Sequence, residues 1–406
     1  MIRVLQTILI GSLCVTLGAQ DVSQWRGPQR TGIYNEKGLL RQWPESGPKM
    51  IWHFDELGEG HTSAAVTSSG VYTTGMLNGT GYVFAFDLMG KLLWKKEYGP
   101  EWTENHYGVR STPLVIKDKL YLMSSFGKLL CMNTANGQTI WSVDVFKEYG
   151  GRNITWGVTE NLLYDGNVLY CSPGGRDAGV IALERNTGKL IWKSKGEGEK
   201  SAYCSPLLVQ LPSRRLLVTR MDRSIQGYDA GSGKFLWSFD FNMEPYVHPN
   251  VPVYIDGYLY CTSGYGLGGV MLKLAADGTG VTEVWRNAKL DPKIGGVVVL
   301  NGIIYGGGDR NRRFFGVDWK TGKELFALNQ LAPANVIAND GLIYIYSENG
   351  KVTLAEPKAD GLNLLSTFTV PLGTGTHWAH LVINNKKLYL RHGNSLMVYD
   401  IASSGS

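Results

Sequence analysis

A short phrase that ends in an aromatic residue recurs along this chain of 406 residues. Its clearest copies are "AFDLMGKLLW", which ends at Trp94, and "LERNTGKLIW", which ends at Trp192. The copies end at Trp94, Trp141, Trp192, Trp237, Trp285, Phe326 and Phe368, with spacings between 41 and 51 residues. A period of this size indicates a supersecondary unit that cannot bury its own faces and must stack on its neighbours.

Each repeat contains four short segments with the composition of β-strands. In the second repeat these segments are residues 112–116, 119–124, 128–133 and 139–144, and turns rich in Gly, Asn, Asp and Lys join them. A tyrosine closes the second segment of most repeats, as at Tyr121 and Tyr170. Four-stranded units arranged radially form a β-propeller, so the sequence predicts an all-β fold.

The ends of the chain indicate how the ring of repeats closes. The tyrosine marker counts eight units when the fourth repeat, which has Val218 in place of the tyrosine, is included, but the last unit, residues 376–402, has room for only three strands. An isolated strand at residues 48–55 carries Trp52, which lies 42 residues before Trp94. We expect residues 20–406 to form a single eight-bladed β-propeller of four-stranded antiparallel blades. The 48–55 strand would complete the last blade and leave no unpaired edge there.

The recurring aromatic residue is expected to pack blade on blade, because a catalytic group is needed once and a packing group in every blade. The four cysteines beyond the leader are each placed in a predicted strand. We interpret them as buried free thiols rather than a disulfide framework. They are Cys131, Cys171, Cys204 and Cys261.

Residues 1–19 have the pattern of a secretory signal peptide. Arg3 precedes an apolar stretch over residues 4–17, and the small residues Gly18 and Ala19 follow. We therefore expect an exported, periplasmic or extracellular protein, monomeric and without a membrane span. The net charge of +5 is mild, and nothing in the sequence indicates nucleic-acid binding.

The loops that enter each blade are the expected place for a ligand site, because eight of them converge on one mouth of the central channel. The residues at this position differ from blade to blade and include imidazole, guanidinium and aromatic side chains. The candidate ligand-binding residues are His61, His106, Arg110, Trp156, Tyr203, His248, Trp378 and His380. Such a set suits sugars or anionic organic molecules.

Glu101 and Glu104 lie in the same loop as His106, so general acid–base work is conceivable, although exposed glutamates in a long loop are usually solvated. A divalent metal could be held by His61, His106 and a carboxylate. No HExxH motif, calcium loop or close histidine pair supports a metal site. Catalytic residues are therefore not assigned.

The repeats resemble those of the pyrroloquinoline-quinone (PQQ)-type propeller superfamily. The segments "QWRGPQRTGI" (24–33), "SAYCSP" (201–206) and "HWAHLV" (377–382) look more narrowly like secreted PQQ-binding-like repeat proteins. The resemblance implies the propeller fold over the whole mature chain. It also implies one of two kinds of function, because the superfamily contains quinoprotein dehydrogenases and non-catalytic proteins, among them a periplasm-facing component of the machine that assembles outer-membrane β-barrels.

The dehydrogenases of this superfamily carry a vicinal cysteine disulfide, a calcium site and a catalytic aspartate. This chain has no Cys-Cys pair, and the metal ligands match no positions in it. We therefore expect a non-enzymatic scaffold of the cell envelope that binds a small molecule or sugar in the central channel, or envelope proteins. The alternative is a PQQ- and calcium-dependent oxidoreductase or a carbohydrate-active enzyme that uses the same pocket.

Overall fold

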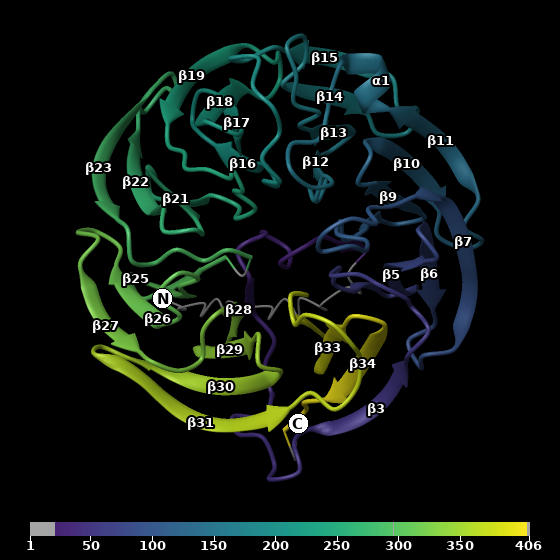
Figure 1. The fold of residues 1–406 in the computed structure, drawn as a ribbon, viewed down its shortest axis with the longest axis vertical. Helices are drawn as coiled ribbons and strands as arrows, with labels where there is room; N and C mark the ends of the chain where they lie inside the picture. Colours follow the sequence, from purple (N-terminus) through teal and green to yellow (C-terminus); the bar gives the residue numbers. More distant parts are fainter. Residues whose placement is uncertain (1–20, 295, 404–406) are drawn as a thin grey trace, which may run out of the picture.

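The computed structural model describes residues 21–294 and 296–403, and the predicted signal peptide lies outside these residues. Eight blades of four antiparallel strands stand around a central axis, as the repeats predict, and two of these sheets gain a fifth short strand from the N-terminal segment (Figure 1). The sheets are numbered here as blades 1–8 in chain order.

The first four blades run from β4 to β19. Blade 1 consists of β4 (Ala65–Thr67), β5 (Gly70–Leu77), β6 (Thr80–Phe86) and β7 (Leu92–Pro100). Blade 2 consists of β8 (Leu114–Ile116), β9 (Lys119–Met123), β10 (Lys128–Asn133) and β11 (Thr139–Asp144). Blade 3 consists of β12 (Leu163–Asp165), β13 (Val168–Cys171), β14 (Val180–Glu184) and β15 (Leu190–Ser194). Blade 4 consists of β16 (Leu207–Gln210), β17 (Arg215–Arg220), β18 (Ser224–Asp229) and β19 (Phe235–Asp240).

The other four blades complete the ring. Blade 5 consists of β20 (Val253–Ile255), β21 (Tyr258–Ser263), β22 (Gly268–Leu274) and β23 (Val281–Asn287). Blade 6 consists of β24 (Val298–Leu300), β25 (Ile303–Gly307), β26 (Phe314–Asp318) and β27 (Glu324–Leu328). Blade 7 consists of β28 (Ala334–Asn339), β29 (Leu342–Ser347), β30 (Lys351–Lys358) and β31 (Gly361–Thr369). Blade 8 consists of β32 (Val382–Asn384), β33 (Lys387–His392), β34 (Ser395–Asp400) and β3 (Lys49–Phe54).

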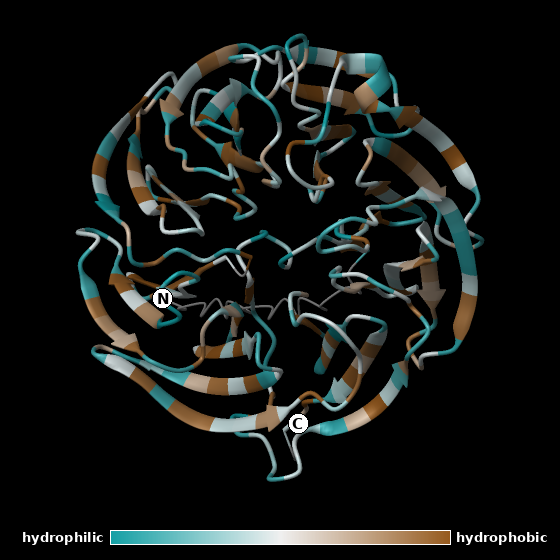
Figure 2. Ribbon diagram, viewed as in Figure 1, coloured by the Kyte–Doolittle hydropathy of each residue, from teal (hydrophilic) through white to brown (hydrophobic). Residues whose placement is uncertain are grey.

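The N-terminal strand β3 closes the ring, which confirms the predicted closure. It pairs antiparallel with β34 from Lys49 opposite Asp400 to Phe54 opposite Leu396, with one irregularity between Met50 and Trp52. Hydrophobic residues are interspersed with hydrophilic ones along the outer strands β3 and β31 (Figure 2), as expected for strands that have one side toward solvent. Among the described residues no helix is long and apolar enough to cross a membrane.

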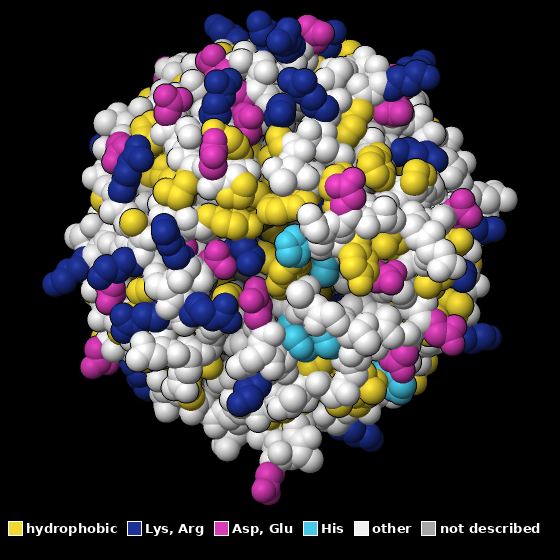
Figure 3. All heavy atoms as spheres, in the orientation of Figure 1, with side chains coloured by type: hydrophobic (Ala, Val, Ile, Leu, Met, Phe, Trp, Pro, Cys, Tyr) yellow, Lys and Arg dark blue, Asp and Glu magenta, His cyan; other side chains and the backbone are white. Residues whose placement is uncertain are grey.

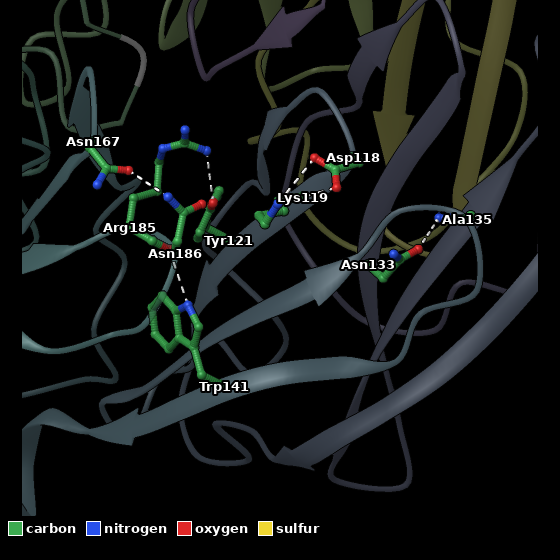
Figure 4. Close-up of polar contacts among 9 residues, drawn as sticks. All are labelled: Asp118, Lys119, Tyr121, Asn133, Ala135, Trp141, Asn167, Arg185 and Asn186. Atoms are coloured by element: carbon green, nitrogen blue, oxygen red, sulfur yellow. Dashed lines mark hydrogen bonds and ion pairs between the residues drawn. The ribbon is translucent and has the colours of Figure 1, made fainter.

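The recurring tryptophans join neighbouring blades, so their packing role is confirmed. In Figure 4, Nε1 of Trp141 donates to the main-chain carbonyl of Arg185 in blade 3 at 3.1 Å. The guanidinium of Arg185 in turn donates a hydrogen bond to the hydroxyl of Tyr121 in blade 2 at 3.0 Å. The indole lies against Gly188, where an added Cβ would stand 2.7 Å from the ring. Equivalent bonds link Trp94 to Thr134, Trp192 to Ala230, Trp237 to Gly278 and Trp285 to Trp319.

The structure differs from the sequence predictions in three local features. A short helix, α1 (Val145–Tyr149), follows blade 2, and the side chain of Asp144 caps it by accepting from the main-chain N of Lys147. The innermost strand of blade 2 begins at Leu114 rather than at residue 112. All four cysteines are buried and free, but Cys204 lies in a loop before β16 instead of within a strand.

The segment before β3 runs through the centre of the ring, which the repeats did not predict. Strand β1 (Val22–Ser23) pairs with β8 in blade 2, and β2 (Ile33–Tyr34) pairs in parallel with β28 in blade 7. The dark purple ribbon of this segment crosses the middle of Figure 1. Between the two strands, Arg26 and Arg30 are buried and donate to main-chain carbonyls of the inner wall, at 2.6 Å to Val297 and 2.9 Å to Leu162. Residues 21–34 therefore occupy the central channel.

Candidate functional site

A cavity of about 150 Å³ opens at one mouth of the channel. Seven of the eight residues selected from the sequence line it, and Figure 3 shows histidines gathered with hydrophobic side chains near the centre of this face. The loops between successive blades supply most of the wall. The lining residues are Trp25, His61, His106, Arg110, Trp156, Thr159, Asn161, Tyr203, Val247, Pro249, Tyr265, Lys293, Ile294, Trp378 and His380.

Aromatic and imidazole rings form a continuous arc along one side of the cavity. The ring of Trp378 lies 4.9 Å from that of His61 and 5.2 Å from that of His106. Trp156 continues the arc, with its ring centroid 5.5 Å from His106 and 6.2 Å from Tyr203. This arc presents flat apolar surface to the cavity, the kind of surface on which a planar or ring-shaped ligand stacks.

Two residues of the arc have left-handed backbone conformations. His106 has φ 56° and Tyr203 has φ 71°. A non-glycine residue in this region costs on the order of 1–3 kcal/mol and persists where its surroundings hold it. The hydroxyl of Tyr203 accepts the main-chain N–H of Trp156 at 2.7 Å, which ties the loops entering blades 3 and 4 together. Local strain and cross-loop bonding thus fix the positions of the rings.

The N-terminal segment forms the floor of the cavity. Trp25 packs edge-on against His380, with ring centroids 4.9 Å apart. Arg26 donates to Nδ1 of His380 at 3.3 Å, and Nε2 of the same imidazole donates to the carbonyl of Ile294 at 3.3 Å. Burial and the charge of Arg26 hold the pKa of His380 well below its ordinary value, so the imidazole is neutral with its proton on Nε2.

The cavity carries positive charge and no negative charge. Arg110 donates to the main-chain carbonyls of His106 and Asn105. Burial lowers the pKa of Arg110 from 12.5 to about 10, so the guanidinium is still charged at neutral pH. The Nζ of Lys293 lies 5.7 Å from the Trp378 ring centroid. Burial, with Arg110 nearby, lowers the pKa of His61 to about 3 and also lowers that of His106. No Asp or Glu is among the residues that line the cavity.

His248 does not line the cavity, in contrast to the sequence-based selection. Its imidazole is buried beneath the loop, with Nδ1 2.8 Å from Oγ of Ser263 and Nε2 donating to the carbonyl of Asp222 at 3.1 Å. Its chain neighbours Val247 and Pro249 line the cavity instead. In an extended loop adjacent side chains point to opposite sides, so the sequence placed the loop correctly but not this side chain.

The two glutamates considered for acid–base chemistry also lie outside the cavity. Glu101 is buried rather than solvated, and accepts from the hydroxyl of Tyr98 at 2.7 Å and from the main-chain N of Ser125 at 3.2 Å. Burial raises its pKa. Glu104 is exposed, as the usual behaviour of loop glutamates suggests. Glu101 is therefore a structural group that holds the hairpin of blade 2.

The lining residues do not fit the quinone and calcium that the resemblance implies. A calcium ion takes six to eight oxygen ligands, with carboxylates prominent, and no carboxylate lines this cavity. Within residues 21–294 and 296–403 there is no group of three or more His, Cys, Asp or Glu side chains that could hold a metal ion. The cysteines are dispersed over separate blades and a loop, so none of them forms a vicinal pair.

Eight of the fifteen lining residues are not among the residues selected from the sequence, and three of these eight, Trp25, Tyr265 and Lys293, supply an indole, a phenol and a cation. Trp25 was quoted only as part of a family motif, since nothing in the repeats indicates that the N-terminal segment enters the channel. Lys293 lies in the loop that enters blade 6, and the residues selected from the sequence include none from that loop. Tyr265 belongs to a hairpin within blade 5, and the blade-entry alignment did not cover hairpins.

Similar solved structures support the architecture. A crystal structure of BamB from Moraxella catarrhalis superposes with a TM-score of 0.59 over 86% of this chain and 97% of that chain, at 15% identity. A quinohemoprotein alcohol dehydrogenase from Comamonas testosteroni superposes with a TM-score of 0.67 over 93% of this chain and 80% of that chain, at 12% identity. At these identities the similarity shows the fold alone.

Sequence comparison identifies the family. The outer membrane protein assembly factor BamB of Kangiella koreensis is 28% identical over 211 residues, which cover 50% of this chain and 49% of that protein. The chain thus spans about half the length of this relative. The sequence profile of the family described as outer membrane protein assembly factor BamB matches residues 79–325, which is more than half of the chain. This protein therefore belongs to that family of PQQ-like β-propellers.

Proposed function

We propose that this protein is a binding scaffold of the cell envelope rather than an enzyme, and that the central cavity is its small-molecule recognition site. The observation that carries the proposal is the composition of the cavity: aromatic rings and cations converge, but no pair of groups suited to acid–base catalysis is present. A general base works best with a pKa near the working pH. His61, with its pKa lowered to about 3, is a poor base at neutral pH.

A second surface supports the scaffold role by offering a place for protein partners. In blades 1–3 the residue before the docking tryptophan is aliphatic and exposed. Leu93, Ile140 and Ile191 are 51%, 45% and 48% exposed on the outer strands β7, β11 and β15. Outer strands also present unpaired main-chain groups to which an extended segment of another protein can add. The name of the related family, an assembly factor, agrees with partners of this kind.

The test is capture of envelope proteins by the exported chain. Chemical crosslinking in intact cells, followed by mass spectrometry, should identify envelope partners of the wild type, and Ile191→Arg should remove them. Lys193→Glu is the matched control, because Lys193 is exposed on the same strand but does not belong to the aliphatic surface. Equal capture by the wild type and Ile191→Arg would contradict this docking surface. Detection of the mature N-terminus near residue 20 in an exported fraction would test the predicted signal peptide.

The enzymatic alternatives require groups that the cavity does not provide. Hydrolysis of glycosides usually uses two carboxyl groups that flank the scissile bond, and none lines the cavity. Titration with PQQ and calcium, followed by tryptophan fluorescence and dye-linked alcohol oxidation, tests the oxidoreductase alternative. We expect no turnover, and saturable binding with turnover would refute the proposal of a non-enzymatic scaffold.

A further inference from the structure

We propose that the ligand of the central cavity is a single six-membered ring that carries one carboxylate group, either a sugar acid or an aryl carboxylate. This inference rests on the proposed function of the cavity and adds the chemical class of its ligand. Three features of the described residues carry it: the size and shape of the space, the excess of positive hydrogen-bond donors, and polar atoms left without partners.

The space suits one ring. A cavity of about 150 Å³ is the size that accommodates a benzene ring in an engineered protein interior. Trp378 and Trp156 stand on either side of His106, with ring centroids 5.2 and 5.5 Å from it, so the wall offers flat faces rather than a tunnel. Trp25 lines the space from the N-terminal segment, and Arg26 contacts the lining imidazole of His380 without itself lining the cavity. A ligand of one ring therefore fills the cavity, and a large fused-ring system does not.

The polar groups of the cavity favour a negative charge on that ring. Arg110 and Lys293 are cations at the wall, and no carboxylate faces them from the lining. Lys293 also lies 3.4 Å from Oδ1 of Asp309, which offsets part of its charge. The net excess at the wall is thus close to one positive charge, which matches a single carboxylate better than several.

A neutral sugar matches the polar groups of the cavity wall less well, because its hydroxyl groups need hydrogen-bond acceptors as well as donors. The amide of Asn161 is the natural acceptor among the lining side chains, but its Oδ1 already accepts from the main-chain N of Thr112 at 2.7 Å. Its Nδ2 donates to Oγ of Ser205 at 3.1 Å. The amide of Asn161 is therefore already engaged, whereas a carboxylate on the ring adds acceptor oxygens that the cations of the wall can satisfy.

Two buried polar atoms of the lining residues lack a hydrogen-bond partner within the described part of the chain. They are Nε2 of His61 and Nε of Arg110. Burying a polar group without a partner is unfavourable, and such groups are commonly completed by a ligand or water. Both atoms are able to donate, since the guanidinium carries a proton on Nε and the neutral imidazole can carry one on Nε2. A carboxylate accepts charge-assisted hydrogen bonds from donors of this kind.

Calorimetric titration of the purified chain tests the inference directly. D-galacturonate and benzoate represent the two sources of the ring, and galactose and benzamide are their uncharged counterparts of similar shape. We expect at least one acid to bind about tenfold or more tightly than its neutral counterpart, and the acid that binds identifies the source. Equal affinity for each acid and its counterpart would overturn the inference, and so would the absence of binding by all four compounds.

Variants locate the binding at the cavity. Arg110→Gln and Lys293→Met should each weaken binding of the acid about tenfold, while Arg152→Gln, an exposed arginine of a neighbouring loop, should leave it unchanged. If Arg110→Gln disturbs the loop that contains Arg110, because the hydrogen bonds of Arg110 are lost, Lys293→Met still tests the contribution of positive charge to binding. An unchanged affinity in Lys293→Met and Arg110→Gln would overturn the inference. If the acids fail to bind but Ile191→Arg still abolishes partner capture, the ligand class is wrong and the scaffold function stands. If the acids do not bind and Ile191→Arg also leaves partner capture unchanged, the proposed function is refuted as well.

Discussion

The buried carboxyl group of Glu160 should make the stability of the propeller fall as the pH rises. Glu160 is fully buried in the loop that enters blade 3, and its carboxylate accepts the main-chain N–H of Ser172 at 2.9 and 3.2 Å. Burial is the main cause that raises its pKa, to about 8, and the bonds to Ser172 and the charge of Arg30 only partly oppose it. We predict that Glu160→Gln removes most of this pH dependence, because glutamine stays neutral.

The sign follows from proton uptake on folding. The folded-state pKa of about 8 lies above the ordinary value of 4.5, so the folded chain holds a proton that the unfolded chain has released between these pH values. The free energy of unfolding therefore falls as the pH rises from about 4.5 to about 8. At about 1.36 kcal/mol for each pH unit, the interval corresponds to a loss of up to about 5 kcal/mol. The wild type and Glu160→Gln should have similar stability at pH 4.5, and the variant should be more stable at pH 8.

Urea unfolding followed by tryptophan fluorescence at pH 5, 6, 7 and 8 measures this difference. Other buried carboxyl groups also contribute to the wild-type curve, but the difference between wild type and variant isolates Glu160. Glu104→Gln, the same change at an exposed position, is the control and should run parallel to the wild type. Parallel curves for wild type and Glu160→Gln would refute the reasoning, since they would mean that Glu160 is ionised in the folded protein at neutral pH.

Three further outcomes follow from the packing. Trp141→Phe loses the hydrogen bond from its indole to the next blade and should lower the free energy of unfolding by about 1–2 kcal/mol. Trp52→Phe removes a buried N–H that has no partner among the described residues, so it should lower the free energy of unfolding by less. Urea unfolding of both variants measures the difference. Gly188 has φ 71°, and in Gly188→Ala the added Cβ would stand 2.7 Å from an indole, so this variant should destabilise the protein by about 2 kcal/mol or more. Gly166 has φ 54°, but in Gly166→Ala the Cβ meets no atom within 4 Å, so this variant should destabilise the protein by only about 1 kcal/mol. Equal melting temperatures of the two variants would contradict this prediction. Arg26→Gln should weaken ligand binding by loosening the floor of the cavity, and an unchanged dissociation constant would show that the floor does not position the site.

The propeller fold could be predicted from the sequence because the same strand and turn pattern occurs in every blade. A phrase that recurs at nearly constant spacing fixes the unit, and a misjudged copy is corrected by the others. Trp52 could be assigned to the closing strand because it continues the same spacing. The cavity could be predicted in part for the same reason, since aligned blade entrances converge on one mouth and bring residues such as His61 and Tyr203 together.

The remaining features lie outside the repeats, where no periodicity constrains the chain. The segment that carries Trp25 and Arg26 has no second copy with which to compare it, and its place in the channel depends on hydrogen bonds to the carbonyls of distant blades. His248 shows a different limit: the loop was placed correctly, but the direction of one side chain depends on the local backbone. Sequence patterns of this kind specify elements better than side-chain directions.

Buried carboxylates explain how the cavity loops can vary in sequence while their backbones stay fixed. Glu101, Glu199 and Asp291 each belong to a loop that enters a blade, and each is buried. Each accepts main-chain N–H groups from hairpin tips: one from blade 2, two from blade 4, and three from blades 5 and 6. These bonds anchor the loop backbone from behind, and bonds made by cavity side chains, such as that between the Tyr203 hydroxyl and the main chain of Trp156, hold it from the front. Because part of the anchoring does not depend on the cavity residues, those residues can differ from blade to blade within one repeated frame, which is how a propeller combines that frame with a single site.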